Sequence, residues 1–124
     1  MDDPVTTKEV IASSQGALRH LRRCIALDIN HVRGNLYRTA SYAVASGLEL
    51  AAPGLIVDVP APGQKAPADV PTIYAELTLA ARPILEIVRA LEPTADQPVL
   101  DAYGAALSAL RAAIPSLTGA EPTF

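Results

Sequence analysis

The sequence predicts an all-α protein: a bundle of three helices, the first very long, with a proline-rich extended arm between the first and the second. Apolar residues recur at steps of three and four along most of the 124-residue chain. Hydrophobic residues make up 50% of the chain and aromatic residues only 4%, so small aliphatic side chains must build the core, which favours close approach of helices. A chain of this length suits one domain, and we treat residues 1–124 as a single helical domain.

The first helix is expected over residues 7–50. Thr6 and Glu9 have the spacing of a capping box, in which each side chain bonds a free backbone N–H of the first turn. One apolar stripe then follows helical spacing as far as residue 50, and its members are Leu18, Leu21, Ile25, Ile29, Val32, Leu36, Ala40, Ala43 and Leu50. A continuous helix over this range would be about 65 Å long at about 1.5 Å per residue.

The continuity of this helix depends on the stretch DINHVRGNLYR, residues 28–38, whose polar residues and glycine are typical of a turn. The apolar phase does not slip across Gly34, whereas a turn would normally break it. A single helix is therefore predicted. Because its length exceeds that of most globular helices, the alternative is a bend or break between Asn30 and Asn35, near Gly34, which would give four helices.

Residues 51–70 are predicted to form an extended arm, partly in the polyproline II conformation. Proline removes a backbone donor and disfavours helix in the preceding residue, and this segment contains Pro53, Pro60, Pro62 and Pro67. Four residues of the arm are too apolar to leave in water and are predicted to make contacts: Leu55, Ile56, Val57 and Val59. They either dock on a neighbouring subunit, as a strand or an extended peptide, or pack on their own chain as a connector.

Two further helices follow the arm. The second is expected over residues 71–92, with Asp69 or Thr72 as its cap and an apolar face made by Ile73, Leu77, Ala80, Ala81, Ile84, Val88 and Leu91. The third is expected over residues 97–114, with a buried stripe made by Val99, Tyr103, Ala106, Leu107, Leu110 and Ile114. A polar tail, residues 115–124, is expected after it, because the proline at its first position stops a helix.

The N-terminus and the cysteine content predict where the protein resides. The first ten residues, MDDPVTTKEV, lack the basic and apolar regions of a signal peptide, so secretion by that route is not expected. Glu49 and Pro53 interrupt the most apolar window, so no membrane span is predicted. The single cysteine, Cys24, excludes an internal disulfide framework and a multi-cysteine metal site. We therefore expect a location in the cytoplasm or within a protein assembly.

The net charge of −3 hides an asymmetry between the two halves of the sequence. Between residues 16 and 47, five arginines face one aspartate, which gives a net charge of +4. From residue 51 onward, four basic residues face eight acidic ones, which gives −4. Opposite halves can neutralise each other within one folded chain, or between neighbouring molecules that assemble head to tail.

A basic flank is predicted on the first helix, and its members are Arg19, Arg22, Arg23, Arg33 and Tyr37. A row of arginines with an interleaved tyrosine could track a phosphate backbone. The same residues could instead pair with the acidic second half, contact an acidic protein neighbour, or only keep a long helix in solution. The sequence pI of 5.2 argues against nucleic acid, because dedicated nucleic-acid binders are usually basic.

The opposite flank of the same helix carries Cys24, Asp28 and His31, which are the residue types of a nucleophile, an orienting acid and a base. Helical geometry argues against this use, because Cys24 and His31 lie about 10 Å apart along the axis and a helix surface is convex. His20 and His31, about 16 Å apart, cannot share a metal ion. The sequence also lacks the common glycine-rich nucleotide and hydrolase motifs. No catalytic residue, metal or cofactor is predicted, and we expect a protein that is not an enzyme.

These features predict a structural protein that self-associates through its long helix and its arm, such as a component of a virion, filament or ring. The second helix, at about 21 residues, covers only about half of the first, so another chain would have to cover the rest of the apolar stripe. The predicted partners are further copies of this chain or another assembly protein. The alternative is a small helical adaptor or regulatory protein that binds a partner protein, a small ligand or nucleic acid through the basic flank.

Overall fold

A computed structural model describes residues 7–55, 64–92 and 97–118, and within these ranges the chain forms four α-helices and no strand. The helices are α1 (Thr7–Leu27), α2 (His31–Ala51), α3 (Val70–Leu91) and α4 (Gln97–Thr118). Each has 21 or 22 residues and is therefore about 32 Å long. The predicted all-α class is confirmed, and none of the described helices is long and apolar enough to cross a membrane.

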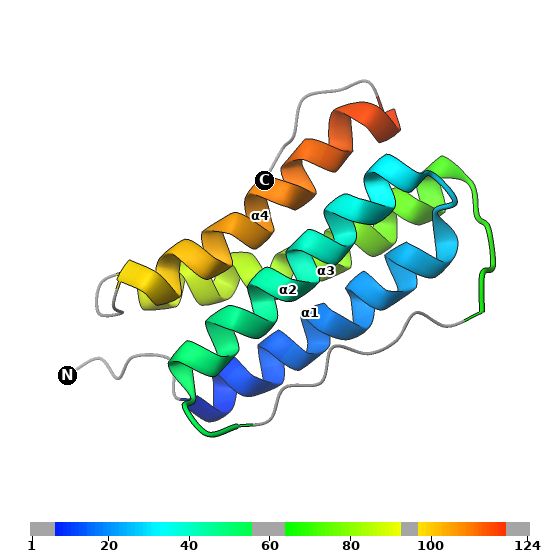
Figure 1. Ribbon diagram of the computed structural model, residues 1–124. Coiled ribbons are helices and arrows are strands. Elements are labelled where there is room, and N and C mark those ends of the chain that lie inside the picture. Colours follow the sequence, from blue (N-terminus) through cyan, green and yellow to red (C-terminus); the bar gives the residue numbers. More distant parts are fainter. Residues whose placement is uncertain (1–6, 56–63, 93–96, 119–124) are drawn as a thin grey trace.

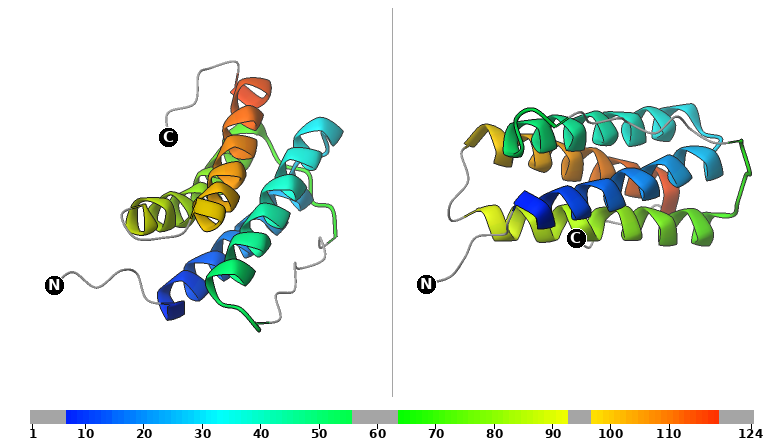
Figure 2. Two further views of the ribbon diagram at one scale, coloured as in Figure 1. Left: turned by 60° about the vertical axis from the view of Figure 1, so that its left-hand side comes forward. Right: turned by 90° about the horizontal axis from the view of Figure 1, so that it is seen from below.

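The four helices form a bundle in which every neighbouring pair is antiparallel (Figure 1). α1 and α2 form a hairpin. α3 begins at the end of the bundle where α2 began, so it runs parallel to α2, and α4 runs back against α3. Both α1 and α4 pack on α2 and α3, which places α1 and α4 diagonally opposite each other (Figure 2). We call the end that holds the α1–α2 connection the joint end, and the opposite end the far end.

The prediction of one continuous helix over residues 7–50 is wrong. α1 ends at Leu27 and α2 begins at His31, so the chain reverses within residues 28–30 and the bundle has four helices. Asn30 is the N-cap of α2: its side-chain oxygen accepts a hydrogen bond from the backbone N–H of Arg33 at 2.9 Å. The reversal turns Ile29 and Val32 outward, and each is 67% exposed although both belonged to the predicted apolar stripe.

Gly34, the expected position of any break, lies buried in the first turn of α2. Its backbone N–H donates to the carbonyl of Asn30 at 2.8 Å, so the helix is already regular there. The reversal over residues 28–30 meets the predicted window of Asn30 to Asn35 only at its first residue, so the chain does break into four helices, as the alternative had it, but not at Gly34. Asn30 marks the break because it caps the start of α2.

The C-terminus of α1 is completed by a segment from far along the chain. The last carbonyls of a helix have no partner within the helix. The N–H of Asp28 satisfies the carbonyl of Cys24. The other three carbonyls, of Ile25, Ala26 and Leu27, accept hydrogen bonds in that order from Lys65 Nζ at 2.7 Å, Ala66 N at 3.0 Å and Ala68 N at 3.0 Å. The chain just before α3 is thereby tied to the end of α1.

The second and third predicted helices correspond to α3 and α4. α3 begins one residue earlier than expected, at Val70, and Asp69 is its N-cap, accepting from the N–H of Thr72 at 3.0 Å. α4 continues through Pro115 to Thr118, so the predicted end at residue 114 is wrong. Pro115 is exposed, so its ring lies on the solvent side of the helix and not in the core.

Two of the sequence predictions fall partly outside the described residues. In the arm, Leu55 is partly buried against the core and its N–H donates to the carbonyl of Ala52. Ile56, Val57 and Val59 lie outside the described ranges, and so does Thr6, the first residue of the predicted capping box. The contacts predicted for the arm as a whole therefore stay a prediction.

The core is mainly aliphatic, as the composition indicated, with two fully buried tyrosines. Tyr103 of α4 lies with its ring against Gly47 of α2, where an added Cβ would come within 2.7 Å of the ring. Its hydroxyl shares a 2.8 Å hydrogen bond with Ser14 of α1. Tyr103 thus links the two diagonal helices α1 and α4 across the middle of the bundle.

Candidate functional site

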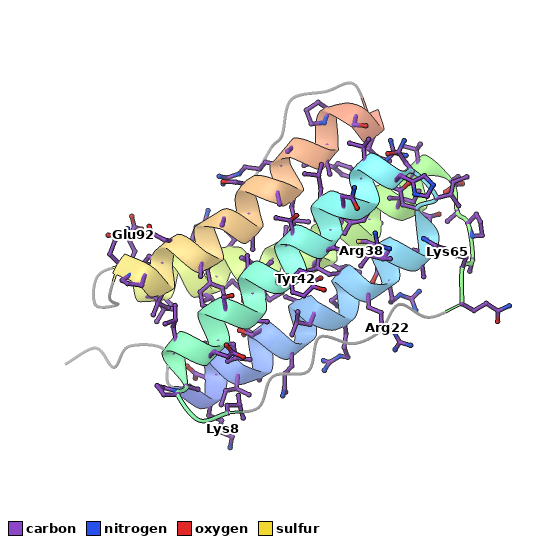
Figure 3. All side chains as sticks on the ribbon, viewed as in Figure 1. Lys8, Arg22, Arg38, Tyr42, Lys65 and Glu92 are labelled. Atoms are coloured by element: carbon purple, nitrogen blue, oxygen red, sulfur yellow. The ribbon has the colours of Figure 1, made fainter. Side chains whose placement is uncertain are left out.

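The predicted basic flank divides into two parts in the structure. Arg19, Arg22 and Arg23 are exposed on α1, and Figure 3 shows Arg22 pointing away from the bundle. Tyr37 is fully buried, and the Arg33 side chain is only 15% exposed. The break in the predicted long helix explains this division. Arg33 and Tyr37 belong to α2, a separate helix, and therefore do not share a face with the arginines of α1. Whether the exposed arginines bind a partner stays a prediction.

Arg33 and Tyr37 instead enclose Asp28, which is 1% exposed at the joint end. Asp28 Oδ2 accepts from Arg33 Nε at 2.6 Å and from the Tyr37 hydroxyl at 2.7 Å. Its Oδ1 accepts from Arg33 Nη2 and from the N–H of Asn30, both at 3.0 Å. Arg33 Nη1 also donates to Ser116 of α4, to the carbonyl at 3.1 Å and to the hydroxyl at 3.2 Å. We call Asp28, Arg33, Tyr37 and Ser116 the Asp28 network.

The Asp28 network holds its groups in fixed protonation states. Burial alone would raise the pKa of Asp28, but hydrogen bonds from Arg33, Tyr37 and the N–H of Asn30 bring that pKa below its ordinary value of 3.8. Burial, and then the hydrogen bond to Asp28, raise the pKa of the Tyr37 hydroxyl well above its usual range. A carboxylate that accepts four hydrogen bonds has no acceptor position facing solvent, so this network ties helices together and offers nothing to a ligand.

The other predicted flank does not form a catalytic arrangement. Cys24 is fully buried, and burial raises the pKa of its thiol, so it is held as an unreactive thiol. Asp28 is occupied by Arg33 and Tyr37, and His31 is exposed at the first position of α2. Within residues 7–55, 64–92 and 97–118, no group of three or more His, Cys, Asp or Glu side chains could hold a metal ion.

An open polar cluster lies where α1 packs on α3. Glu76 of α3 has a side chain that is 10% exposed, and its Oε1 contacts His20 Nδ1 at 2.8 Å and Arg23 Nε at 3.2 Å, both on α1. The His20 side chain is 35% exposed and that of Arg23 is 67% exposed. We call these three residues the Glu76 cluster. Sequence reasoning missed it, because His20 and Glu76 are 56 positions apart and no pattern on one helix shows which helix will face it.

An open depression of about 370 Å³ lies beside this cluster on the surface of α1. Its lining is formed by Arg19, Arg22, Arg23 and Ala26. Arg23 is oriented by Glu76, whereas Arg19 and Arg22 have no acidic partner within the described parts of the chain. The depression is therefore a positively charged concavity in which anionic groups would be favoured.

The charged residues are also separated along the bundle axis. In the half that includes the joint end, the described residues contribute seven basic and three acidic side chains, a net charge of +4. In the half that includes the far end, three basic face five acidic side chains, a net charge of −2. In Figure 3, Glu92 and Lys8 lie toward the far end, and Arg22, Arg38 and Lys65 lie toward the joint end.

Comparisons with protein-family models, with curated proteins and with solved structures find no significant match to this chain. Any functional conclusion therefore rests on the residues and their geometry.

Proposed function

We propose that the protein is a non-enzymatic assembly component whose molecules associate end to end, the basic joint end of one against the acidic far end of the next. The observation that carries this proposal is the opposite net charge of the two halves of the bundle, +4 and −2 over the described residues. A contact between two different surfaces repeats from molecule to molecule, which generates rings or filaments.

The joint end has further features that suit a protein contact. Ile29, Val32 and Val70 are 67%, 67% and 43% exposed there, so this end presents apolar as well as basic side chains. At the far end Leu50 is 50% exposed beside the exposed Glu49. An interface that combines apolar contact with a charged rim is the common arrangement between proteins, and charge complementarity sets its orientation.

The reason for self-association differs from the one that the sequence suggested. Residues 7–51 form the hairpin of α1 and α2, and both helices bury their apolar faces in one core. They therefore leave no long apolar stripe for another chain to cover. The charge asymmetry between the two halves of the sequence persists, but folding converts it into a separation between the two ends of the bundle. Contact between molecules through charge then takes the place of contact through an apolar helix.

Sedimentation velocity at several protein concentrations tests this proposal. We expect association at about 20 mM NaCl that weakens strongly at about 500 mM, because salt screens contacts between exposed charges. A far-end variant with Glu86, Glu92 and Asp101 changed to Lys should stay monomeric, because the net charge of that half becomes 6 − 2 = +4. A joint-end variant with Arg19, Arg22 and Arg38 changed to Glu should also stay monomeric, because the net charge of that half becomes 4 − 6 = −2. A mixture of the two variants should associate again, since the acidic joint end of one then meets the basic far end of the other.

A control variant carries a charge reversal that preserves the opposite ends. Arg89→Glu lies at the far end and makes it more acidic, so this variant should associate at least as strongly as the natural chain. A protein that is monomeric at every concentration in low salt would contradict the proposal. Association that is unchanged by salt would also contradict it.

The second candidate function is that of an adaptor that binds an acidic segment of another protein through α1. Arg19 and Arg22 favour it, since they line a concavity and have no acidic partner within the described residues. Under this function the natural chain is monomeric in low salt, yet binds an acidic peptide with an affinity that Arg19→Gln and Arg22→Gln reduce. The sedimentation experiment therefore separates the two candidates.

A further inference from the structure

We propose that His20 is a phosphoryl-acceptor site, modified at Nε2 by a donor of the acyl phosphate or phosphoramidate class. The proposal rests on the Glu76 cluster and on the arginine-lined depression beside it, and does not depend on end-to-end assembly. It concerns covalent modification of this chain, which neither candidate function includes.

The first step of the argument is the hydrogen position on the imidazole ring. Glu76 Oε1 accepts from Arg23 Nε at 3.2 Å and lies 2.8 Å from His20 Nδ1. A carboxylate held by an arginine acts as an acceptor, so Nδ1 carries the hydrogen and donates it to Glu76. Nε2 then has the free lone pair. A hydrogen bond made by one ring nitrogen in this way fixes both the tautomer and the orientation of the ring.

The second step is access to Nε2. Its ring is part of a side chain that is 35% exposed, and Nε2 has no hydrogen-bond partner among the described residues. No buried side-chain nitrogen or oxygen within the described residues lacks a partner, so Nε2 must face solvent. A reagent can therefore reach Nε2 from solvent.

The third step is the charge around the ring. A phosphoryl group brings negative charge, which arginine stabilises well through its planar array of N–H donors. Arg23 is fixed beside His20 by the shared Glu76. Arg19 folds back along α1, since its Nη2 lies 3.8 Å from where a Cβ on Gly16 would be. Both arginines line the depression, so cationic groups that favour a phosphorylated donor lie on the same helix as His20.

The reaction needs no group of the chain outside the Glu76 cluster. The Nε2 lone pair attacks phosphorus and forms the N–P bond, while the P–O bond of an acyl phosphate breaks and its electron pair leaves with the carboxylate. With a phosphoramidate the P–N bond breaks instead, and the electron pair leaves with the protonated nitrogen as a neutral amine. The ring becomes cationic. Glu76 stabilises that charge through Nδ1–H, which is the usual role of a carboxylate behind a reacting histidine. The ring proton then passes to Glu76 or to water.

His31 provides a matched control within the same chain, since the sequence has only two histidines. It is exposed at the first position of α2 and has no carboxylate partner among the described residues. If exposure alone decided reactivity, His31 would react faster than the half-buried His20. The proposal predicts the opposite order.

The test treats the full-length protein with acetyl phosphate or with phosphoramidate and follows each histidine over time. Intact mass measures the number of phosphoryl groups added, peptide fragmentation assigns them, and phosphorus NMR identifies the N–P bond. We expect His20 to react at least about tenfold faster than His31, as positioned general-base groups accelerate reactions by about 10²–10⁴-fold. In urea, where the Glu76 cluster is lost, the two rates should become equal.

Glu76→Gln keeps the shape of the side chain but removes its charge, and should lower the rate at His20 to that at His31. Circular dichroism confirms that the variant is folded before its rates are compared. Equal rates at His20 and His31 in the folded natural chain would overturn the proposal, even if Glu76→Gln failed to fold. A His20 rate unaffected in folded Glu76→Gln would overturn it as well, because Glu76 would then only link α1 to α3.

Discussion

The Asp28 network and the Glu76 cluster use the same chemical groups to different ends. In each, a carboxylate with little exposure binds an arginine and a third polar side chain. Asp28 is enclosed on every side, and its partner Arg33 is itself 15% exposed and held by Ser116. Glu76 is covered, but its partners Arg23 and His20 extend into solvent.

The difference shows how burial of the partners, rather than of the carboxylate, decides what a polar cluster can do. In the Asp28 network both carboxylate oxygens accept all their hydrogen bonds from groups of the chain, so these bonds stabilise the fold. In the Glu76 cluster the carboxylate orients two side chains whose outer atoms stay available. Three substitutions break or sharpen this contrast, and they are ordered here by the size of the expected effect.

Asp28→Asn should lower the free energy of unfolding by about 3–5 kcal/mol, since it leaves the Arg33 guanidinium poorly exposed and without a counter-charge. Urea denaturation followed by circular dichroism measures it. Asp101→Asn, on the exposed face of α4, is the control and should change stability by less than about 0.5 kcal/mol. A loss below about 1 kcal/mol for Asp28→Asn would mean that Asp28 does not hold the joint.

The same variant gives a pH dependence with a definite sign. The pKa of Asp28 is lower in the folded chain than its ordinary value of 3.8, so its contribution is complete above that value and is lost as the pH falls toward the folded pKa. Asparagine mimics the protonated acid. The gap in unfolding free energy between the natural chain and Asp28→Asn should therefore narrow below pH 3.8, and a constant gap would contradict the assigned pKa shift.

Tyr37→Phe should cost about 1.5–3 kcal/mol, because the lost hydrogen bond is made to a charged group. Tyr103→Phe is the matched comparison, since Tyr103 is equally buried but shares its hydrogen bond with the neutral Ser14. It should cost about 0.5–1.5 kcal/mol. Thermal or urea unfolding of both variants tests the order, and a larger loss for Tyr103→Phe would reverse our view of which tyrosine matters more.

Arg23→Ala should change stability by less than about 1 kcal/mol, because 67% of its side chain is exposed and solvent screens its pair with Glu76. The measurement is again urea unfolding, with Arg82→Ala on the exposed face of α3 as the control. A loss as large as that of Asp28→Asn would show that the Glu76 cluster is a structural link of the same kind as the Asp28 network.

The sequence predicted the helical class, and the start of α3 to within one residue, because these depend on local signals. Apolar spacing and the cap Asp69 are read from neighbouring residues. The end of α1 was missed although its signal, the pair Asp28 and Asn30, stood in the chain. The apolar residues Ile29 and Val32 keep the helical spacing of three and four across the reversal, although the chain changes direction there and both side chains are exposed. The periodicity of apolar residues reports spacing along the sequence, and it does not show whether the chain reverses direction.

The candidate site was harder to predict for a different reason. Arg19, Arg22 and Arg23 were recognised as a basic flank, but Arg33 and Tyr37 were assigned to it through the helix that does not exist. The partner of His20 and Arg23 is Glu76, supplied by a helix that begins about fifty residues later. Which helices become neighbours depends on how the whole core packs. The residue pattern of a single helix does not contain this information.

The pairing of α1 with residues 65–68 has a consequence for how the chain is made. During synthesis α1 and α2 emerge first, and the local part of the Asp28 network is complete once Tyr37 has appeared. The carbonyls of Ile25, Ala26 and Leu27 must wait for Lys65, Ala66 and Ala68. When those residues arrive, they anchor the chain at the joint end immediately before α3 begins. The growing protein thus has a fixed starting point for its second pair of helices before either helix has left the ribosome.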